Sequence, residues 1–269
     1  MTKRRRLLKI GAALLGAGMI AFLLVLASAF VGNPISKHIA GEEIRGHISK
    51  NYPNLELEVG EVRYNFKFGE YYAEVSSPTS KDTHFTVFWR GSECYDDYKS
   101  AVLEGWNTCG RLADEYFAQI KPLLKTIPGI LAEDGSRVDV AKEDLEEGID
   151  IPLDTPYQKG LPLDFTLSLY AESAAPTLDE AAGLLEKVYR ILKENGHSFT
   201  AYGVFIQNSE VDEAYVMVYD VTPEMIERGD LAEYLYECED APGANDPGIT
   251  VSPFKKDRKS TRLNSSHRL

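Results

Sequence analysis

The stretch "YNFKFGEYYAEVSSPTSKDTHFTVFW", residues 64–89, decides the fold, because its many aromatic residues could form either a binding site or the inside of a sheet. Large apolar residues recur at every second position, as side chains on one face of a strand do. They are Tyr71, Ala73 and Val75 in one run and Phe85, Val87 and Trp89 in the next. Gly, Pro and Ser mark turns at residues 67–70, 77–80 and 90–92. We therefore expect antiparallel strands rather than a catalytic set.

Two further runs, residues 55–59 and 93–95, extend this sheet in the sequence. Before them, "NPISKHIAGEEIRGHISKNYP", residues 33–53, predicts an amphipathic helix with Asn33 as its N-cap and Pro34 at its first position. Its apolar face is expected to carry Ile35, Ile39, Ile44 and Ile48. One helix on a meander of antiparallel strands makes residues 33–97 a small α+β domain, similar to cystatin and PepSY domains.

Residues 10–32, "IGAALLGAGMIAFLLVLASAFVG", contain no charged residue. At about 1.5 Å per residue, a helix of this length spans a hydrocarbon core of about 30 Å. The basic cluster in residues 1–9 predicts a cytoplasmic N-terminus. The sequence thus indicates a single-pass cell-membrane anchor, N-in and C-out, with an extracytoplasmic body. Ala27-Ser28-Ala29 leaves open the alternative of a cleaved signal peptide.

The charge of the chain is divided by region. The whole chain has 29 basic and 42 acidic residues. Residues 1–32 hold five basic residues and no acid, and residues 255–269 hold six basic residues and one acid. The body, residues 33–254, is left with 18 basic and 41 acidic residues, a formal charge of -23. So acidic a body repels phosphate backbones, which disfavours nucleic acid as a partner.

The second half of the body also predicts an α+β arrangement. Residues 98–128 are expected to form a bridging helix interrupted at Pro122, followed by a Gly-, Pro- and acid-rich linker at residues 129–161. The second α+β domain, residues 162–254, reads as a strand, a helix opened by Thr177 and Glu180, a hairpin of residues 199–207 and 214–221, and a last helix from Thr222-Pro223 through Tyr236.

The sequence singles out no catalytic, cofactor-binding or metal-ligating residue. His38, His47, His84 and His197 lie in no nucleophile motif or metal-ligand spacing, and His84 is expected at a surface or edge. Glu93, Asp96 and Asp97 lack the spacing of a calcium loop, and Asp97 is expected to cap the helix that follows. Asp134 and Asp139 also lack that spacing. Cys94, Cys109 and Cys238 form no zinc motif, and a Cys94–Cys109 bridge is left open.

Three stretches, residues 33–53, 64–89 and "YDDYKSAVLEGWNTCGRL" at 95–112, resemble the YfjL-like proteins of Gram-positive bacteria. This resemblance implies a membrane-anchored extracytoplasmic protein with an N-terminal and a C-terminal domain, and it brings no functional residues. With no catalytic set in the sequence, we expect a non-enzymatic interaction or regulatory module that contacts the membrane through its N-terminal helix and an envelope protein through its body. The alternatives are an envelope enzyme using a carboxylate pair and a cation-binding surface protein.

The C-terminal residues differ sharply in composition from the acidic, aromatic body. Residues 257–269, "DRKSTRLNSSHRL", hold four basic residues and no aromatic one. Residues 257–267 resemble the in-frame translation of a widely used short-read sequencing adaptor. We therefore expect the basic tail, residues 255–269, to be foreign to the natural protein, whose own C-terminus would lie beyond Lys256.

Overall fold

The structure is a computed structural model that describes residues 3–141, 150–210, 214–241, 243 and 247–252, except for the side chains at 3–8, 21, 24, 25, 27 and 29. The chain divides into two compact units, residues 1–107 with 152–154 (unit 1) and residues 108–151 with 155–269 (unit 2). Each unit has its own sheet and its own core, so the expected α+β class with two domains is confirmed. The tail at residues 257–269 lies outside the described residues.

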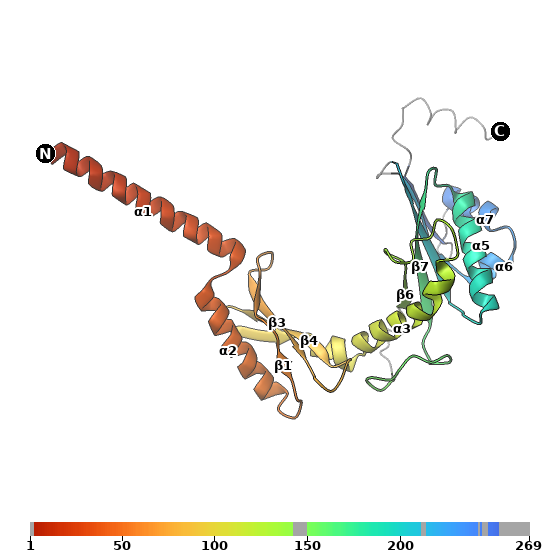
Figure 1. The fold of residues 1–269 in the computed structure, drawn as a ribbon, viewed down its shortest axis with the longest axis horizontal. Coiled ribbons are helices and arrows are strands. Elements are labelled where there is room, and N and C mark those ends of the chain that lie inside the picture. The colour runs from red at the N-terminus through yellow and green to blue at the C-terminus, as the bar shows by residue number, and fades with distance from the viewer. Residues whose placement is uncertain (1–2, 142–149, 211–213, 242, 244–246, 253–269) are drawn as a thin grey trace. The chain divides into compact units, whose positions relative to one another are not determined.

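Unit 1 begins with two helices, α1 (Lys3–Val31) and α2 (Pro34–Asn51), drawn in red and orange in Figure 1. Counting only the described residues, no helix combines the length and apolar character needed to cross a membrane. Asn33 caps α2 as expected, because its side-chain oxygen accepts hydrogen bonds from the backbone N–H groups of Ile35 and Ser36.

The predicted apolar face of α2 is wrong in one respect. Ile44 and Ile48 are buried, whereas Ile35 and Ile39 are 71% and 44% exposed. A step of five residues, from 39 to 44, turns a helix by about 140° and so changes its face. Ala40 supplies the buried position that Ile39 was expected to fill.

The sheet of unit 1 has five strands in the order β1-β3-β4-β5, with β2 also pairing with β3. Their bounds are β1 Glu58–Val59, β2 Arg63–Asn65, β3 Glu70–Ser76, β4 His84–Arg90 and β5 Glu93–Asp96. β2 was not predicted; it pairs with the first half of β3 while β1 pairs with its end. Between them the Gly60 N–H donates to the carbonyl of Glu74, 2.8 Å away. All pairs are antiparallel.

The alternation in residues 64–89 is confirmed. Tyr71, Ala73, Val75, Phe85 and Val87 are buried in the unit 1 core with residues of α2. The other face carries an aromatic row, in which Phe88 lies 6.3 Å from Tyr72 and 5.0 Å from Tyr95 between ring centroids.

The predicted helix of residues 98–128 is divided. A π-helical turn, η1 (Lys99–Leu103), ends before Gly105, which has a left-handed φ of 79°. The α-helix α3 (Trp106–Leu124) then continues past Pro122, which lies in its last turn.

The sheet of unit 2 has the order β10-β9-β8-β7-β6. Its strands are β6 Arg137–Val140, β7 Phe165–Ser173, β8 Ala201–Asn208, β9 Tyr215–Val221 and β10 Gly248–Ser252. β7 and β8 are parallel and are joined through α5 (Leu178–Glu194), while the other pairs are antiparallel. β6 lies within the stretch expected to be a linker, where only Val138 and Val140 alternate and the signal is correspondingly short.

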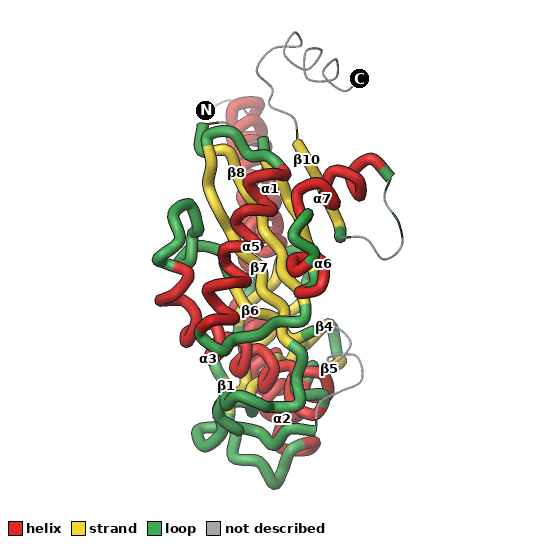
Figure 2. Tube along the Cα trace, turned by 90° about the vertical axis from the view of Figure 1, so that its right-hand side faces the viewer, coloured by secondary structure: helices red, strands yellow, loops and turns green. Residues whose placement is uncertain are grey.

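Figure 2 shows α5, α6 (Pro223–Glu227) and α7 (Leu231–Asp240) on one face of this sheet. The last helix was predicted as one continuous element, but it breaks at Gly229, whose φ of 81° is left-handed. The buried residues of α3 and α5 join the inward side chains of β7, β8 and β9 in a single core.

Candidate functional site

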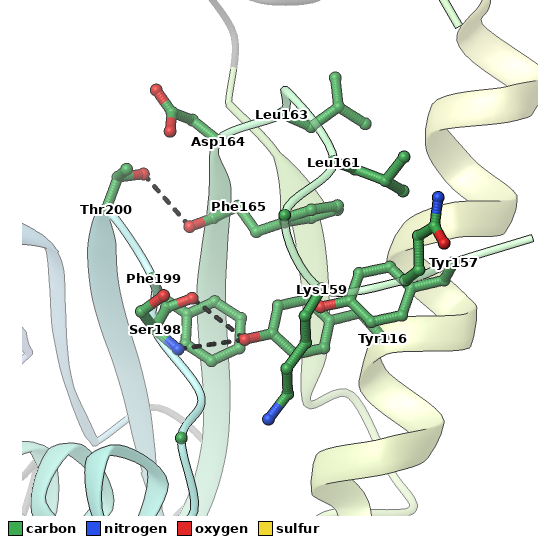
Figure 3. A pocket seen from close by; sticks show the side chains of 13 residues that line it. Tyr116, Tyr157, Lys159, Leu161, Leu163, Asp164, Phe165, Ser198, Phe199 and Thr200 are labelled. Carbon is green, nitrogen blue, oxygen red and sulfur yellow. Dashed lines mark hydrogen bonds between the residues drawn. The ribbon is translucent and has the colours of Figure 1, made fainter.

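The candidate site is a pocket in unit 2 of about 300 Å³ (Figure 3). It lies where three segments meet: Tyr116 of α3, the loop of residues 157–164 leading into β7, and residues 196–200 before β8. The loop contributes Lys159, Leu161, Leu163 and Asp164 to the wall. A volume of this size is at the lower end of those that take small molecules and suits one large side chain.

Aromatic rings form one side of the pocket. The Tyr116 ring stacks between Tyr157 and Phe199, with centroid distances of 4.6 Å and 4.8 Å. The Phe165 ring meets Tyr116 edge-on at 5.2 Å. Offset-stacked and edge-on rings stabilise one another beyond the area they bury, so the structure holds this wall in place before any ligand arrives.

The hydroxyl of Tyr116 joins α3 to the segment before β8. It donates to the carbonyl of Ser198 at 3.1 Å and accepts from the N–H of Ser198 at 3.2 Å. Nearby, the Thr200 hydroxyl donates to the carbonyl of Phe165 at 3.2 Å. Burial raises the pKa of Tyr116, opposed by its hydrogen bond with Ser198. The Tyr116 hydroxyl is therefore a neutral structural group at ordinary pH.

Charged groups lie at the pocket's edge. Lys159 and Asp164 both line it. His197 lies beside it, with its ring 5.7 Å from that of Tyr116. Burial lowers the pKa of His197, and the neighbouring charge of Lys159 lowers it further. His197 is consequently neutral near pH 7.

The described lining of the pocket holds few ionisable side chains. Its described lining contains neither Cys nor His, and Asp164 is its one carboxylate. A glycosidase-type mechanism needs two carboxyl groups that face each other across the substrate. The described lining provides no second one.

A second depression, in unit 1, has two carboxylates, those of Glu74 and Asp97. Asp97 Oδ1 accepts a hydrogen bond from the N–H of Thr86 at 2.6 Å, and Glu74 lies 3.7 Å from the guanidinium of Arg63. The expectation that Asp97 caps the next helix is wrong, because its side chain binds this strand instead. A cap contact comes from Asp96, which accepts from the N–H of Tyr98 at 3.1 Å.

Asp96 also meets one of the histidines considered above. Its Oδ2 lies 2.6 Å from His47 Nε2, and both side chains are largely buried. Asn51 contacts the same ring from the next turn of α2. His84 is exposed, as predicted for a surface position. Among the described residues, no group of three or more His, Cys, Asp or Glu side chains is placed to hold a metal ion.

Cys94 carries a free thiol, so the Cys94–Cys109 bridge left open by the sequence is not formed. Burial raises the pKa of this thiol, and the charge of Glu43 raises it further. A thiol with a raised pKa is a poor nucleophile at neutral pH.

Sequence reasoning missed every residue of the unit 2 pocket. Tyr116, Phe165 and Phe199 are far apart in the chain, and each fits a core pattern by itself. One signal was present: Tyr157 is an aromatic residue within the Pro- and Gly-rich run "DTPYQKGLP", residues 154–162. Such a residue in a loop needs a contact elsewhere in the fold.

The fold and pocket define a two-domain α+β protein whose second domain has a pocket lined by aromatic rings. Both domains match known families: residues 7–97 match the YfjL-like N-terminal domain and residues 115–236 match the YfjL-like C-terminal domain. The chain belongs to the YfjL-like family. It is 25% identical over 194 residues to "Uncharacterized protein YfjL" of Bacillus subtilis (strain 168), covering 68% of this chain and 80% of that protein. No solved structure matches the chain significantly.

Proposed function

We propose that this protein is a membrane-anchored extracytoplasmic protein of the cell envelope that binds a partner protein and catalyses no reaction. The observation that carries the binding role is the unit 2 pocket, which is already walled by stacked rings and whose tyrosine and threonine hydroxyls are bound to backbone groups. Preformed apolar concavities of this kind bind a ligand without a large ordering cost.

The chemistry of the pocket describes its ligand. Rings on one side favour an aromatic or large aliphatic side chain. Lys159 forms no ion pair with a described residue, so its ammonium group is available to a carboxylate next to that side chain. The ligand is then a peptide segment with one large apolar residue beside an acidic one.

Support for the anchor comes from the sequence of the α1 region, which includes residues whose side chains the structure does not describe. Residues 10–32 have no charged residue, and the large apolar side chains described on α1 are exposed in every direction around the helix. In water such a surface is unfavourable, at about 25 cal/mol per Å², whereas lipid covers it without cost. The basic residues that precede it favour a cytoplasmic N-terminus.

Photo-crosslinking tests the binding role in intact cells that make the protein. A photoreactive phenylalanine analogue at Leu161, in the pocket wall, should give a defined adduct with one envelope protein. Tyr157→Ala in the same chain should abolish that adduct. The analogue at Tyr219, which is exposed on β9, serves as the control. An adduct from Leu161 that survives Tyr157→Ala, or the same adduct from both positions, contradicts binding in the pocket.

Protease added to intact cells tests the topology. It should degrade the chain after Val31 and leave the basic N-terminal segment intact. Protection of the body means that the orientation is reversed. N-terminal sequencing distinguishes the anchor from a cleaved signal, which would give a mature protein beginning near Phe30.

The enzyme and cation-binding alternatives are tested on purified residues 33–254. Turnover of a cell-wall glycan by purified residues 33–254, lost on substituting a carboxylate pair, would replace the binding role. A calcium-dependent rise in melting temperature would favour the cation-binding alternative.

A further inference from the structure

Two exposed phenylalanines lie in the turn between β2 and β3. Phe66 and Phe68 are 63% and 56% exposed, although tight turns normally carry small or polar residues. The turn is closed by a hydrogen bond from the Gly69 N–H to the Asn65 carbonyl at 2.8 Å, and Gly69 takes a left-handed φ of 66°. Both rings therefore stand on an ordered turn rather than on a loose loop.

This turn is held beside the end of α1. The Phe66 ring is 6.1 Å from that of Phe30, which is itself exposed near the last residue of the helix. Tyr71, at the start of β3, ties the same junction: its hydroxyl accepts from the Asn33 N–H at 2.6 Å and donates to the Asn33 carbonyl at 3.1 Å.

A further exposed apolar side chain lies in the first turn of α2, close along the chain to the end of α1. Ile35 is exposed and follows Val31 by four residues, a reach of about 14 Å at most. Phe30, Ile35, Phe66 and Phe68 together are called the apolar collar below. It is continuous with the apolar surface of α1.

The charges near the collar suit a bilayer surface. Lys67 stands between the two phenylalanines, with its ammonium group 5.5 Å from the Phe68 ring centroid. A lysine beside apolar side chains can place its stem in the interface and its charge at lipid phosphates. Glu70, the next acid along the chain, is buried and bound to Arg90 at 2.8 Å, so it does not oppose this contact.

We infer that the apolar collar inserts into the headgroup and upper acyl region of the outer leaflet, and that it sets the orientation of the first domain on the membrane. The inference rests on the proposed membrane anchor. A second copy of the chain could cover the apolar collar instead of lipid. The collar, however, lies where the proposed anchor leaves the bilayer, and the anchor itself would stand in the way of such a contact.

The experiment uses the full chain in phosphatidylglycerol–phosphatidylethanolamine vesicles whose acyl chains carry bromine, a contact quencher of tryptophan. Phe66→Trp places a probe in the collar. Leu103→Trp is the matched control, because Leu103 is also exposed and belongs to η1, whose Ala101 lies by Ser76 and His84 at the far end of the sheet. Flotation of the protein with the vesicles measures membrane attachment through the anchor separately. The emission of the wild-type chain, which contains Trp89 and Trp106, is subtracted.

We expect both variants to float with the vesicles, and the added emission of Phe66→Trp alone to be blue-shifted and lost to bromine. Flotation without quenching at position 66 overturns the inference and leaves the anchor standing. A blue shift without quenching means that a second copy covers the collar, and equal quenching of both variants means adsorption of the whole domain; each overturns it. Failure to float refutes the anchor, and the inference with it.

Discussion

The hydroxyl of Tyr116 offers the most direct test of how the unit 2 pocket is built. Tyr116→Phe keeps the ring, its stacking on Tyr157 and Phe199, and its buried volume. It removes the hydroxyl, and with it the two hydrogen bonds to Ser198. A typical hydrogen bond contributes about 0.5–1.5 kcal/mol net. Ser198 is exposed, so water can replace part of this contact. We expect a loss of about 1–2 kcal/mol in the free energy of unfolding of unit 2.

Tyr116→Ala removes the ring as well and should cost about 3–5 kcal/mol, the usual range for deleting a buried aromatic side chain. Tyr215→Phe is the matched control, because its ring packs on Phe205 at 5.2 Å and its hydroxyl has no partner among the described residues. That variant should match the wild type.

Urea unfolding of residues 33–254, followed by far-UV circular dichroism, measures these differences. With a urea dependence of about 2 kcal/mol per M, Tyr116→Phe should lower the midpoint by about 0.5–1 M. Trp89 and Trp106 both belong to unit 1, so their fluorescence records that unit separately. Faster amide exchange at Ser198 should accompany the loss.

The reasoning fails if Tyr116→Phe and Tyr215→Phe unfold at the same urea concentration. It also fails if Tyr116→Phe costs as much as Tyr116→Ala, since the rings would then contribute nothing.

Further predictions concern four other residues. Burial lowers the pKa of His197 in the folded protein, so its imidazole is protonated in the unfolded chain at a higher pH than in the folded one. Unit 2 should therefore lose stability as the pH falls below about 6.5, and His197→Gln should flatten that pH dependence. An NMR titration midpoint of 6.5 or higher for His197 would contradict this prediction. Arg90→Ala leaves the buried Glu70 carboxylate with its hydrogen bond from Tyr95. The free energy of unfolding of unit 1, followed by tryptophan fluorescence, should fall by about 1–2 kcal/mol, less than for a fully buried pair because Arg90 is 55% exposed. Arg90→Lys should lower it less. Gly32→Ala puts a Cβ 2.9 Å from the Tyr71 hydroxyl at a φ of 79°. It should cost about 1–2 kcal/mol of backbone strain and speed amide exchange at Asn33. Gly46→Ala adds a Cβ that meets nothing within 4 Å and should stabilise α2 by about 0.5–1 kcal/mol.

Periodic patterns predicted the parts of the fold in which one face is buried. Tyr71, Ala73 and Val75 alternate because β3 has a core on one side only. Helical phase was less secure, since Ile39 and Ile44 look like one apolar series until their five-residue spacing is converted to an angle. β6 and β2 are too short for a pattern, and both depend on pairing with a longer strand.

The unit 2 pocket could not be predicted from the sequence, for a different reason. Its walls come from residues far apart in the chain, such as Tyr116 and Ser198, which are 82 positions apart. Nothing local in "YFAQ" or "HSFT" distinguishes a pocket wall from ordinary core. Only the parallel pairing of β7 with β8 brings Phe165 and Thr200 together beneath α3.

The hydrogen bonds between Tyr71 and Asn33 have a mechanical consequence. Any tension applied to the chain through α1 passes Asn33, where both backbone polar groups are bound by one hydroxyl. That hydroxyl belongs to β3, the strand that pairs with β1, β2 and β4. The pull is therefore shared among several ladder hydrogen bonds at once instead of peeling an outer strand, and α2 keeps its place on the sheet while the junction is strained.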